Sequence, residues 1–592
     1  MKKILAVLFF FCAFSVFAQN EQLAANYFEK GDFEKALLSY EDLITKQPNN
    51  FIYFQRVIEC YQQLSQFEKA HALLQKRLEK NKQPNLYIEI GYNYQLQNDV
   101  KNATKNYDLA VEKIKEHPAN AYGIANAFEK KSLLDYALKT YNLALQIDPK
   151  LNFNQQMAML YGQQGKVDLM IEKFLEEGEK NPQTTIHIQN YLSRFLTDEG
   201  DENFAGVLRK ALILKTQKSQ DTYWNSFLSW FYVQQKEYGK AFIQEKAIYK
   251  RNPESFHNIV SLADLAIQEG QNDDAVAIIN FVLENTQDID LQVYSHTFLL
   301  KNRISNSTAK DYPAIKSDLE LLLKKFGLSP FTISLQELQA SFYAFQLNEI
   351  ESGKNILKNA LKFPLSEFQK ASLKMQLADI LLLQEQYNQA LIFYSQIEEN
   401  LKNDDIGHEA SLKVAKTSYF QGDFKWAQSQ FKILKSASTQ LIANDALEYF
   451  LLIADNTVAD STQVALKKFA RGDFLMYQNK YELALAEFSK ILTEHKGEEI
   501  EAATLLRMGK LNEKLGNFTE ALSLYKKIID NHPECIYVDE ALFFSAEIYD
   551  LHLKQPENAK PLYEKMIFNH QDSIYFIESR RKFREIRGDN NT

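Results

Sequence analysis

The chain has 592 residues, of which 45% are hydrophobic and 24% are charged, and its formal net charge is -9 at pH 7. The normal apolar content excludes an intrinsically disordered chain, while 3 cysteines and 19 glycines exclude disulfide-stapled and collagen-like proteins. The acidic balance also argues against general nucleic-acid binding, which needs a basic face.

The N-terminus has the pattern of a secretory signal peptide. Lys2 and Lys3 precede an apolar stretch, Ile4–Phe17, that is too short to cross a bilayer of about 30 Å as a helix. Ala18 is a small residue at the end of this stretch and favours cleavage after residue 18, with an uncleaved anchor as the alternative. We expect an exported, periplasmic protein that associates at most peripherally with the outer membrane.

Cysteine usage predicts neither a disulfide nor a lipid anchor. Cys12 lies inside the apolar stretch instead of just after it, which disfavours lipidation. Cys60 and Cys535 are too distant in an extended array to be bridged, because a disulfide needs Cα atoms within about 7 Å. We expect both to be buried thiols.

After the signal, one spacing of small and aromatic residues recurs along the chain. In one copy it comprises Ala125, Phe128, Ala137, Tyr141 and Pro149. Offsets of three and four place such residues on one helical stripe, so small residues let two antiparallel helices approach while aromatics fill the space between pairs. Glycine in turns such as Lys30–Asp32 ends the first helix, and proline stops the second.

This pattern resembles the tetratricopeptide repeat (TPR) family, whose units are helix-turn-helix pairs of about 34 residues. The anchor positions in the first half lie about 34 residues apart, at Ala36, Ala70, Ala103, Ala137 and Met170. Later anchors, mostly about 37 residues apart, are Ala241, Ala275, Gly353, Ala390, Ala427, Ala484, Ala521 and Ala559. The resemblance implies an all-α, superhelical TPR-type solenoid of antiparallel helix pairs, with more than ten repeats.

Changes in the spacing predict the domain organisation. We expect an N-terminal TPR solenoid at 19–287, an irregular helical joint at 288–330 and a C-terminal TPR solenoid at 331–572. The wide gap between Ala427 and Ala484 predicts an extra helix near 441–454 that belongs to no pair. Residues 573–592 should form a basic capping helix and tail, because terminal repeats need a polar outer face.

No catalytic motif stands out, so we expect a chain that is not an enzyme and has neither cofactor nor metal. The chain has no HExxH, CxxC, Walker-type or G-x-S-x-G sequence. His532 and Cys535 have metal-like spacing but lie in a turn with no second pair, which favours a structural role. The alternative of a catalytic site within 288–330 has little support, because His296 is the single candidate catalytic residue there.

The resemblance implies that the first helix of each pair lines a concave groove, and two surfaces are candidates for binding. The candidate peptide groove is rich in amides and tyrosine, at Gln55, Gln62, Tyr92, Gln95, Tyr122, Asn126 and Gln155. Amides both donate and accept hydrogen bonds, and tyrosine offers rigid contact area, so an extended peptide could be held there. A general bias of this chain toward Asn and Gln explains the same residues equally well.

The second candidate is the docking cap, the cations of the last helix at Arg580, Arg581, Lys582, Arg584 and Arg587. They could dock an acidic partner or anionic lipid headgroups, or simply form a solvated helix C-terminus. A carboxylate clamp, as some TPR modules use, is not expected in the first groove. Asn126 fits that motif, but Gln55, Ile88, Tyr122 and Gln155 stand where cations are needed.

The resemblance extends to cell-envelope proteins. Residues 427–470 resemble uncharacterised TPR proteins of Bacteroidota bacteria, and 537–575 resemble TPR units of periplasmic proteins involved in envelope assembly. This implies a non-catalytic scaffold or adaptor that holds together an envelope or outer-membrane assembly through protein partners, without nucleic acid. The alternative is a periplasmic holdase that binds extended peptides in the Tyr/Gln-rich groove.

Overall fold

The computed structural model describes residues 20–196, 202–437, 440–457 and 463–588. These residues form helices and turns, with no β-strand among them, and the fold is an all-α TPR-type solenoid. The chain divides into two compact units, residues 1–235 (unit 1) and 236–592 (unit 2). The expected signal peptide at 1–18 lies outside the described residues. Within the described ranges, no helix is long and apolar enough to cross a membrane.

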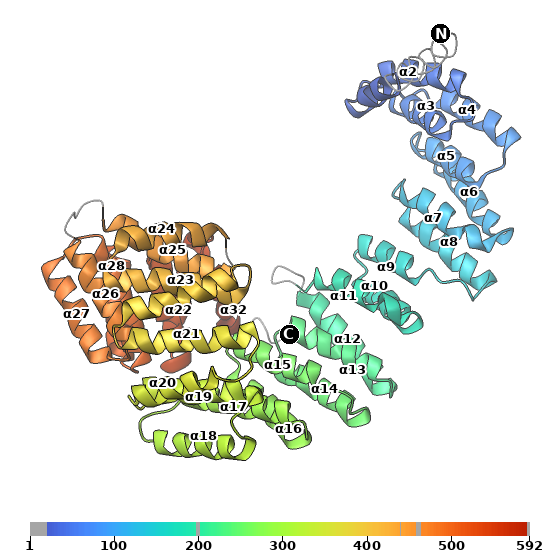
Figure 1. The fold of residues 1–592 in the computed structure, drawn as a ribbon. Coiled ribbons are helices and arrows are strands. Elements are labelled where there is room, and N and C mark those ends of the chain that lie inside the picture. Colours follow the sequence, from blue (N-terminus) through green and yellow to red (C-terminus); the bar gives the residue numbers. More distant parts are fainter. Residues whose placement is uncertain (1–19, 197–201, 438–439, 458–462, 589–592) are drawn as a thin grey trace, which may run out of the picture. The chain divides into compact units, whose positions relative to one another are not determined.

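Unit 1 is a row of helix pairs that follow one another in chain order (Figure 1). Residues 20–29 are helical and pair with the first labelled helix. The remaining elements are α2 (Phe33–Lys46), α3 (Phe51–Gln63), α4 (Phe67–Lys80), α5 (Pro84–Gln95), α6 (Val100–Glu112), η1 (Lys113–Lys115), η2 (Pro118–Asn120), α7 (Ala121–Glu129), α8 (Leu134–Ile147), α9 (Asn154–Gln163), α10 (Val167–Lys180), η3 (Pro182–Thr184), α11 (Thr185–Ser193), α12 (Glu202–Lys218) and α13 (Thr222–Gln234).

Unit 2 continues the alternation with longer helices. Its elements up to α24 are α14 (Tyr238–Arg251), α15 (His257–Gln268), α16 (Asn272–Asn285), α17 (Ile289–Ser305), α18 (Tyr312–Phe326), η4 (Pro330–Thr332), α19 (Ile333–Phe345), α20 (Ile350–Ala360), α21 (Glu367–Leu383), α22 (Tyr387–Asn400), α23 (Asp405–Gln421) and α24 (Phe424–Ala437). Then follow α25 (Gln440–Asp455), α26 (Val464–Tyr477), α27 (Tyr481–Glu494), α28 (Ile500–Lys514), α29 (Phe518–Asn531), α30 (Val538–Glu547), η5 (Ile548–His552), α31 (Pro556–Asn569) and α32 (Phe576–Arg587).

The turns inside the pairs share one backbone geometry. A residue with positive φ stands two positions before the second helix, as Gly31 (φ 75°) does before Phe33. The next N–H closes the turn, as when Asp32 donates to the carbonyl of Tyr27 at 2.9 Å. Glycine was expected there, but many turns use other residues; the turns include Gly31, Ser65, Asn98, Ser132, Gly165, Gly270, Asn348, Glu385, Gly422, Asn479, Gly516 and Lys554.

Small residues in first helices face aromatics in second helices, as the spacing predicts. A Cβ built on Gly91 would lie 2.5 Å from the ring of Tyr107, and one on Gly509 would lie 2.3 Å from the ring of Tyr525. Tyr107 and Tyr525 are both buried. Small-to-aromatic contacts of this kind let the two helices of a pair approach closely around a buried ring.

The longer period in the second half comes from longer first helices. α21 and α23 have 17 residues each, compared with 13 in α3 and 12 in α5. The segment 288–330, expected to be an irregular helical joint, contains two helices, α17 and α18, followed by η4. Val293 and Leu300 of α17 and Leu319 of α18 are buried in one hydrophobic cluster, so this segment is part of the array. The division between the two units lies at 235/236, far from it.

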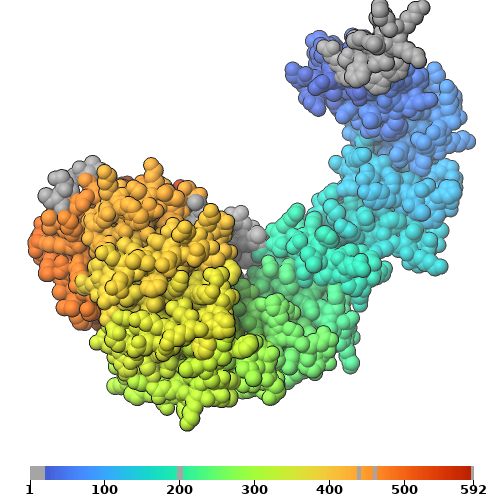
Figure 2. Space-filling view, in the orientation of Figure 1, coloured from blue at the N-terminus to red at the C-terminus, as the bar shows by residue number. Residues whose placement is uncertain are grey.

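Contacts between helices that are not neighbours in the row distinguish unit 2. α25 occupies the interval where the spacing predicts an unpaired helix, and α26 follows it. The hydroxyl of Tyr477, in α26, donates to the carbonyl of Asp379, in α21, at 2.8 Å. The side-chain amide of Gln478 donates to the carbonyl of Leu383 at 2.9 Å. These two bonds join α26 to α21 across the helices between them in the sequence, and the yellow to orange surface of this part of unit 2 is continuous in Figure 2.

Candidate functional site

In unit 1, first helices of three successive pairs meet around a small pocket of about 90 Å³. We call the surface that these helices share the first-helix face. The pocket is lined by residues of α3, α5 and α7 and the turn after α7: Phe51, Phe54, Gln55, Ile58, Asn85, Leu86, Glu89, Gly123, Asn126, Ala127, Lys130 and Lys131. First helices therefore form a hollowed surface, as the TPR resemblance implies, and two of the predicted groove residues, Gln55 and Asn126, line it.

A largely buried ion pair lies in this pocket. Lys131 Nζ is 3.1 Å from Glu89 Oε2, and the two side chains are 11% and 15% exposed. Burial raises the pKa of Glu89, and the charge of Lys131 opposes that shift. The same ammonium lies 4.6 Å from the centre of the Tyr92 ring, a cation–π distance. The Lys131 ammonium thus contacts both a carboxylate and an aromatic ring.

The predicted groove residues differ in how much surface they present. Tyr122 is 56% exposed, and Gln155 is also exposed. Gln55 is half-buried and donates to Glu59 at 3.1 Å, while Gln95 accepts from the hydroxyl of Tyr107 at 2.7 Å. Gln62 is only 5% exposed and offers almost no surface to a partner.

Glu89 and Lys131 were missed by the sequence analysis, and the reason is geometric. The predicted groove residues stand at the same few positions relative to the small residue of each first helix, and Glu89 and Lys131 stand at other positions. Successive helices in a solenoid are rotated relative to one another, so a pocket between three of them uses different offsets on each. The available signal was chemical, because Glu89 stands between the apolar residues Ile88 and Ile90.

Unit 2 contains a larger cavity of about 940 Å³, which we call the unit 2 cavity. Residues of α21, α22, α23, α25, α26 and α28 line it. Its lining residues are Asp379, Leu382, Tyr394, Asp405, Ile406, Glu409, Leu412, Lys413, Lys416, Phe420, Ile442, Asp445, Glu448, Tyr449, Asp473, Met476, Tyr477 and Arg507. The repeat pattern does not predict the unit 2 cavity, because the cavity depends on the contact between α26 and α21.

A buried guanidinium organises one end of the unit 2 cavity. Arg507 donates to Glu448 at 2.7 Å, and its Nε lies 3.2 Å from Asp473. Tyr419, fully buried, donates its hydroxyl to the other oxygen of Asp473 at 3.2 Å. Burial raises the pKa of Asp473, while Arg507 beside it opposes the shift. Paired and hydrogen-bonded, these charges join α23, α25, α26 and α28.

Two lysines along α23 are paired with carboxylates from other helices. Lys413 Nζ lies 2.7 Å from Asp379, which also accepts from the hydroxyl of Tyr394 at 2.6 Å. Lys416 Nζ lies 2.9 Å from Asp445 and 5.1 Å from the centre of the Tyr449 ring. Each cation of the cavity wall therefore already has a carboxylate partner.

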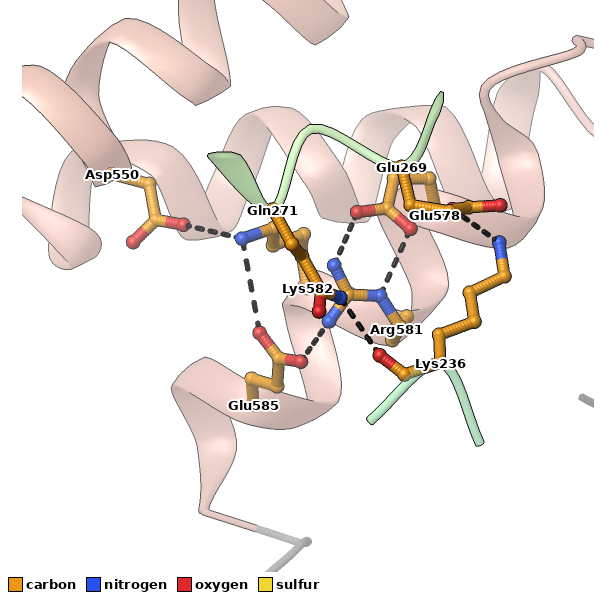
Figure 3. A network of polar contacts seen from close by, with 8 residues as sticks. All are labelled: Lys236, Glu269, Gln271, Asp550, Glu578, Arg581, Lys582 and Glu585. Carbon is orange, nitrogen blue, oxygen red and sulfur yellow. Dashed lines mark hydrogen bonds and ion pairs between the residues drawn. The ribbon is translucent and has the colours of Figure 1, made fainter. Parts of the chain in front are cut away.

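The basic residues of α32 are also engaged in contacts within unit 2 (Figure 3). Arg581 Nε donates to Glu578 at 2.9 Å, and its other nitrogens bond Glu578 and Glu585. Lys582 Nζ lies 3.8 Å from Asp550, and the Arg587 guanidinium lies 5.8 Å from the Phe583 ring. Arg580 is half-buried. The hydrogen bond from Arg581 lowers the pKa of Glu578. Docking of a partner through this cap stays a prediction.

Figure 3 also draws the polar contacts of the turns around α14–α16. Lys236 Nζ lies 2.8 Å from Glu269, and the side-chain amide of Gln271 donates to the Lys236 carbonyl at 2.7 Å. These contacts hold two successive turns together and have the character of structural support.

Among the residues that the structure describes, no group of three or more His, Cys, Asp or Glu side chains could hold a metal ion. His532 Nε2 lies 3.9 Å from Glu501. Cys60 is fully buried, and burial raises the pKa of its thiol to about 12. Cys535 is only partly buried, in contrast to the expectation, because it lies in the turn before α30.

Comparisons with known proteins give the same repeat type. The family model described as tetratricopeptide repeat matches residues 22–50 and 503–534. The TPR repeat-containing protein YpiA of Bacillus subtilis (strain 168) is 22% identical over 265 residues, which cover 44% of this chain and 61% of that protein. The match thus spans less than two thirds of the relative.

Two solved structures align over most of the chain. One is described as Naa15/Naa10 bound to HypK-THB, with 12% identity, coverage of 97% of this chain and 92% of that chain, and a TM-score of 0.27. The other is the APC/C hetero-tetramer Cut9-Hcn1, with 13% identity, coverage of 95% of each chain and a TM-score of 0.25. At these scores the likeness says nothing about function.

Proposed function

We propose that this chain is a non-catalytic scaffold or adaptor that binds protein partners in the periplasm and holds together an envelope or outer-membrane assembly. The observation that carries the proposal is the first-helix face of unit 1, where three successive first helices place the amides of Gln55, Asn85 and Asn126 around one pocket. Solenoids of this kind use such extended surfaces for binding proteins. The periplasmic setting rests on the signal-peptide pattern of residues 1–18.

The face has the chemistry of a protein-binding surface rather than that of an active site. Tyr122, 56% exposed, supplies a rigid aromatic contact with a hydrogen-bonding tip. Asn126 and Gln155 add groups that both donate and accept hydrogen bonds to a backbone. Lys131 is paired with Glu89, and the exposed Lys130 gives the lining one further positive charge.

Site-specific photo-crosslinking in the native envelope tests the proposal. A photoreactive residue replaces Tyr122 on the first-helix face, and a matched control replaces Leu109, a 41% exposed residue of the second helix α6. A scaffold that uses this face gives one or two defined adducts from position 122 and none of them from position 109. Equal adducts from both positions, or none from 122, would contradict the proposal.

The pattern of adducts also distinguishes a scaffold from the alternative, a periplasmic holdase. A diffuse set of unrelated unfolded proteins at position 122 would favour the holdase, because a holdase binds many extended segments weakly. Cell fractionation, with mass spectrometry of the mature N-terminus, checks the setting independently. Recovery of a chain that begins at Gln19 from the periplasm is the expected result, and an uncleaved cytoplasmic chain would refute it.

A further inference from the structure

The unit 2 cavity is a built site that the proposed function does not use. At about 940 Å³, it lies at the upper end of the range of about 300–1,000 Å³ that ligand pockets occupy. Its walls come from helices far apart in the sequence, and the hydrogen bonds of Tyr477 and Gln478 to α21 hold them in place. A fixed cavity of this size needs little reorganisation to receive a ligand.

The charge of the cavity wall is unbalanced. Six carboxylates line it, against three cations. Lys413, Lys416 and Arg507 are each paired with a carboxylate of the wall, so their charges are neutralised inside the protein. Lys413 lies 2.7 Å from Asp379 and 3.5 Å from Glu409, so one cation is shared by two carboxylates, and Asp405 adds a further exposed negative charge at the beginning of α23. An entering ligand therefore meets excess carboxylate oxygen.

The rest of the wall is aromatic and apolar. Phe420, Tyr449 and Tyr477 line the cavity with Leu382 and Met476. Lys416 already lies over the ring of Tyr449, which shows that this wall accommodates a cation against an aromatic face. Carboxylates with aromatic rings suit a long side chain that has an apolar stem and a positive head, as in lysine and arginine.

We propose that the unit 2 cavity binds an extended polypeptide segment that presents Lys or Arg side chains. This inference deepens the proposed function, on which it rests, by giving one partner site its chemistry. The carboxylates draw the cationic heads to the cavity, and the aromatic and aliphatic wall contacts their stems. An acidic segment would be repelled by the same wall.

Fluorescence anisotropy of the full chain with short labelled peptides tests this. One peptide alternates lysine with leucine and serine, and the matched peptide has glutamate in place of each lysine. We expect the lysine peptide to bind at least tenfold more tightly, with an affinity that falls as salt is raised. The variant carries Asp405→Asn and Glu409→Gln at two exposed positions of the wall, where Glu409 lies 3.5 Å from Lys413, and should weaken lysine-peptide binding about fivefold to tenfold.

The control variant carries Glu398→Gln and Glu399→Gln at the end of α22, which removes the same charge outside the cavity wall. It should leave the affinity for the lysine peptide within about twofold of the unchanged chain. Equal loss in both double variants, equal binding of both peptides, or no binding of either would overturn the inference. Dimerisation that the first double variant abolishes, measured by light scattering, would assign the cavity to a second copy instead.

These outcomes are separate from the test of the proposed function. Crosslinks from position 122 report on unit 1, and they can succeed while the peptide experiment fails. In that case the chain remains a scaffold without a cationic-segment site in unit 2.

Discussion

Lys131 Nζ lies 3.1 Å from Glu89 Oε2, and this ion pair is mostly hidden from solvent between α5 and the turn after α7. Replacing Lys131 with methionine keeps the length of the side chain but leaves the Glu89 carboxylate buried without its partner. We expect unit 1 to lose about 3 kcal/mol of stability at pH 7. Denaturant unfolding measures this loss, and Lys130→Met, at an exposed neighbouring position, serves as the control.

The pH dependence of this variant has a definite sign. Burial already raises the pKa of Glu89, and loss of Lys131 raises that pKa further. A carboxyl group with a raised folded-state pKa contributes stability below its unfolded pKa, and that contribution is lost as pH rises through the folded pKa. The deficit of Lys131→Met should therefore shrink as pH falls from 7 to about 4, near the ordinary pKa of glutamate. A deficit of the same size at both pH values would exclude this account.

Turn residues with positive φ give a stabilising substitution. Lys554, at φ 54°, adopts the left-handed conformation that costs an ordinary side chain roughly 1 kcal/mol, and it precedes α31 by two positions. Lys554→Gly should stabilise unit 2 by about that amount. Gly516→Ala, at φ 77° with open space around it, should destabilise the unit by about as much. Thermal unfolding of the two variants should shift in opposite directions, and shifts of the same sign would contradict the prediction.

The close approach of Gly509 to Tyr525 is sensitive to a single methyl group. An alanine Cβ at 509 would lie 2.3 Å from the buried ring, so the ring or helix α28 must move. We expect Gly509→Ala to destabilise unit 2 by about 1–3 kcal/mol, although alanine favours a helix more than glycine does. The control is Gly123→Ala in α7, where a Cβ meets nothing within 4 Å and should be neutral or stabilising. If both substitutions stabilised the protein, the packing account would be wrong.

The buried Glu337 in α19 should make the folded chain less stable at alkaline pH. Burial raises the pKa of its carboxyl group to about 7, partly opposed by a hydrogen bond from Ser372. Protonation of Glu337 contributes to the stability of the folded chain below the ordinary pKa of glutamate. That contribution is lost as pH rises through about 7, the pKa of Glu337 in the folded chain. Glu337→Gln should therefore gain up to about 3 kcal/mol over the unchanged chain at pH 8 and almost nothing at pH 4. Calorimetry measures the stability of Glu337→Gln at both pH values, with the exposed Glu399→Gln as the control. An equal gain at pH 4 and pH 8 would contradict the prediction.

Sequence reasoning succeeds here where the repeat is local. Ala125 and Phe128 lie three apart on one helix, Ala137 and Tyr141 lie four apart on the next, and this spacing predicts a helix pair and its buried face. The turn at Gly422 was recognisable for the same reason, since glycine tolerates φ of 84°. The equivalent turns at Ser65 and Glu385 carry no such signal, because their geometry is imposed by the helices on each side.

The candidate site was only partly predictable. Tyr122 and Asn126 follow from the position of the first helices, whereas Glu89 and Lys131 come together only through the rotation between successive pairs. The unit 2 cavity depends on contacts such as that of Tyr477 with Asp379, which join segments far apart in the sequence. A pattern read along one chain contains no information about such contacts.

The hydrogen bonds from Tyr477 and Gln478 to the backbone of α21 have a further consequence for how unit 2 comes apart. In a linear array each repeat touches only its neighbours, so segments fray and reform almost independently. The bonds from α26 bypass the intervening helices and close a loop in the network of contacts. The stretch from α21 to α26 should thus exchange its amide protons as one cooperative block, more slowly than the open row of pairs in unit 1.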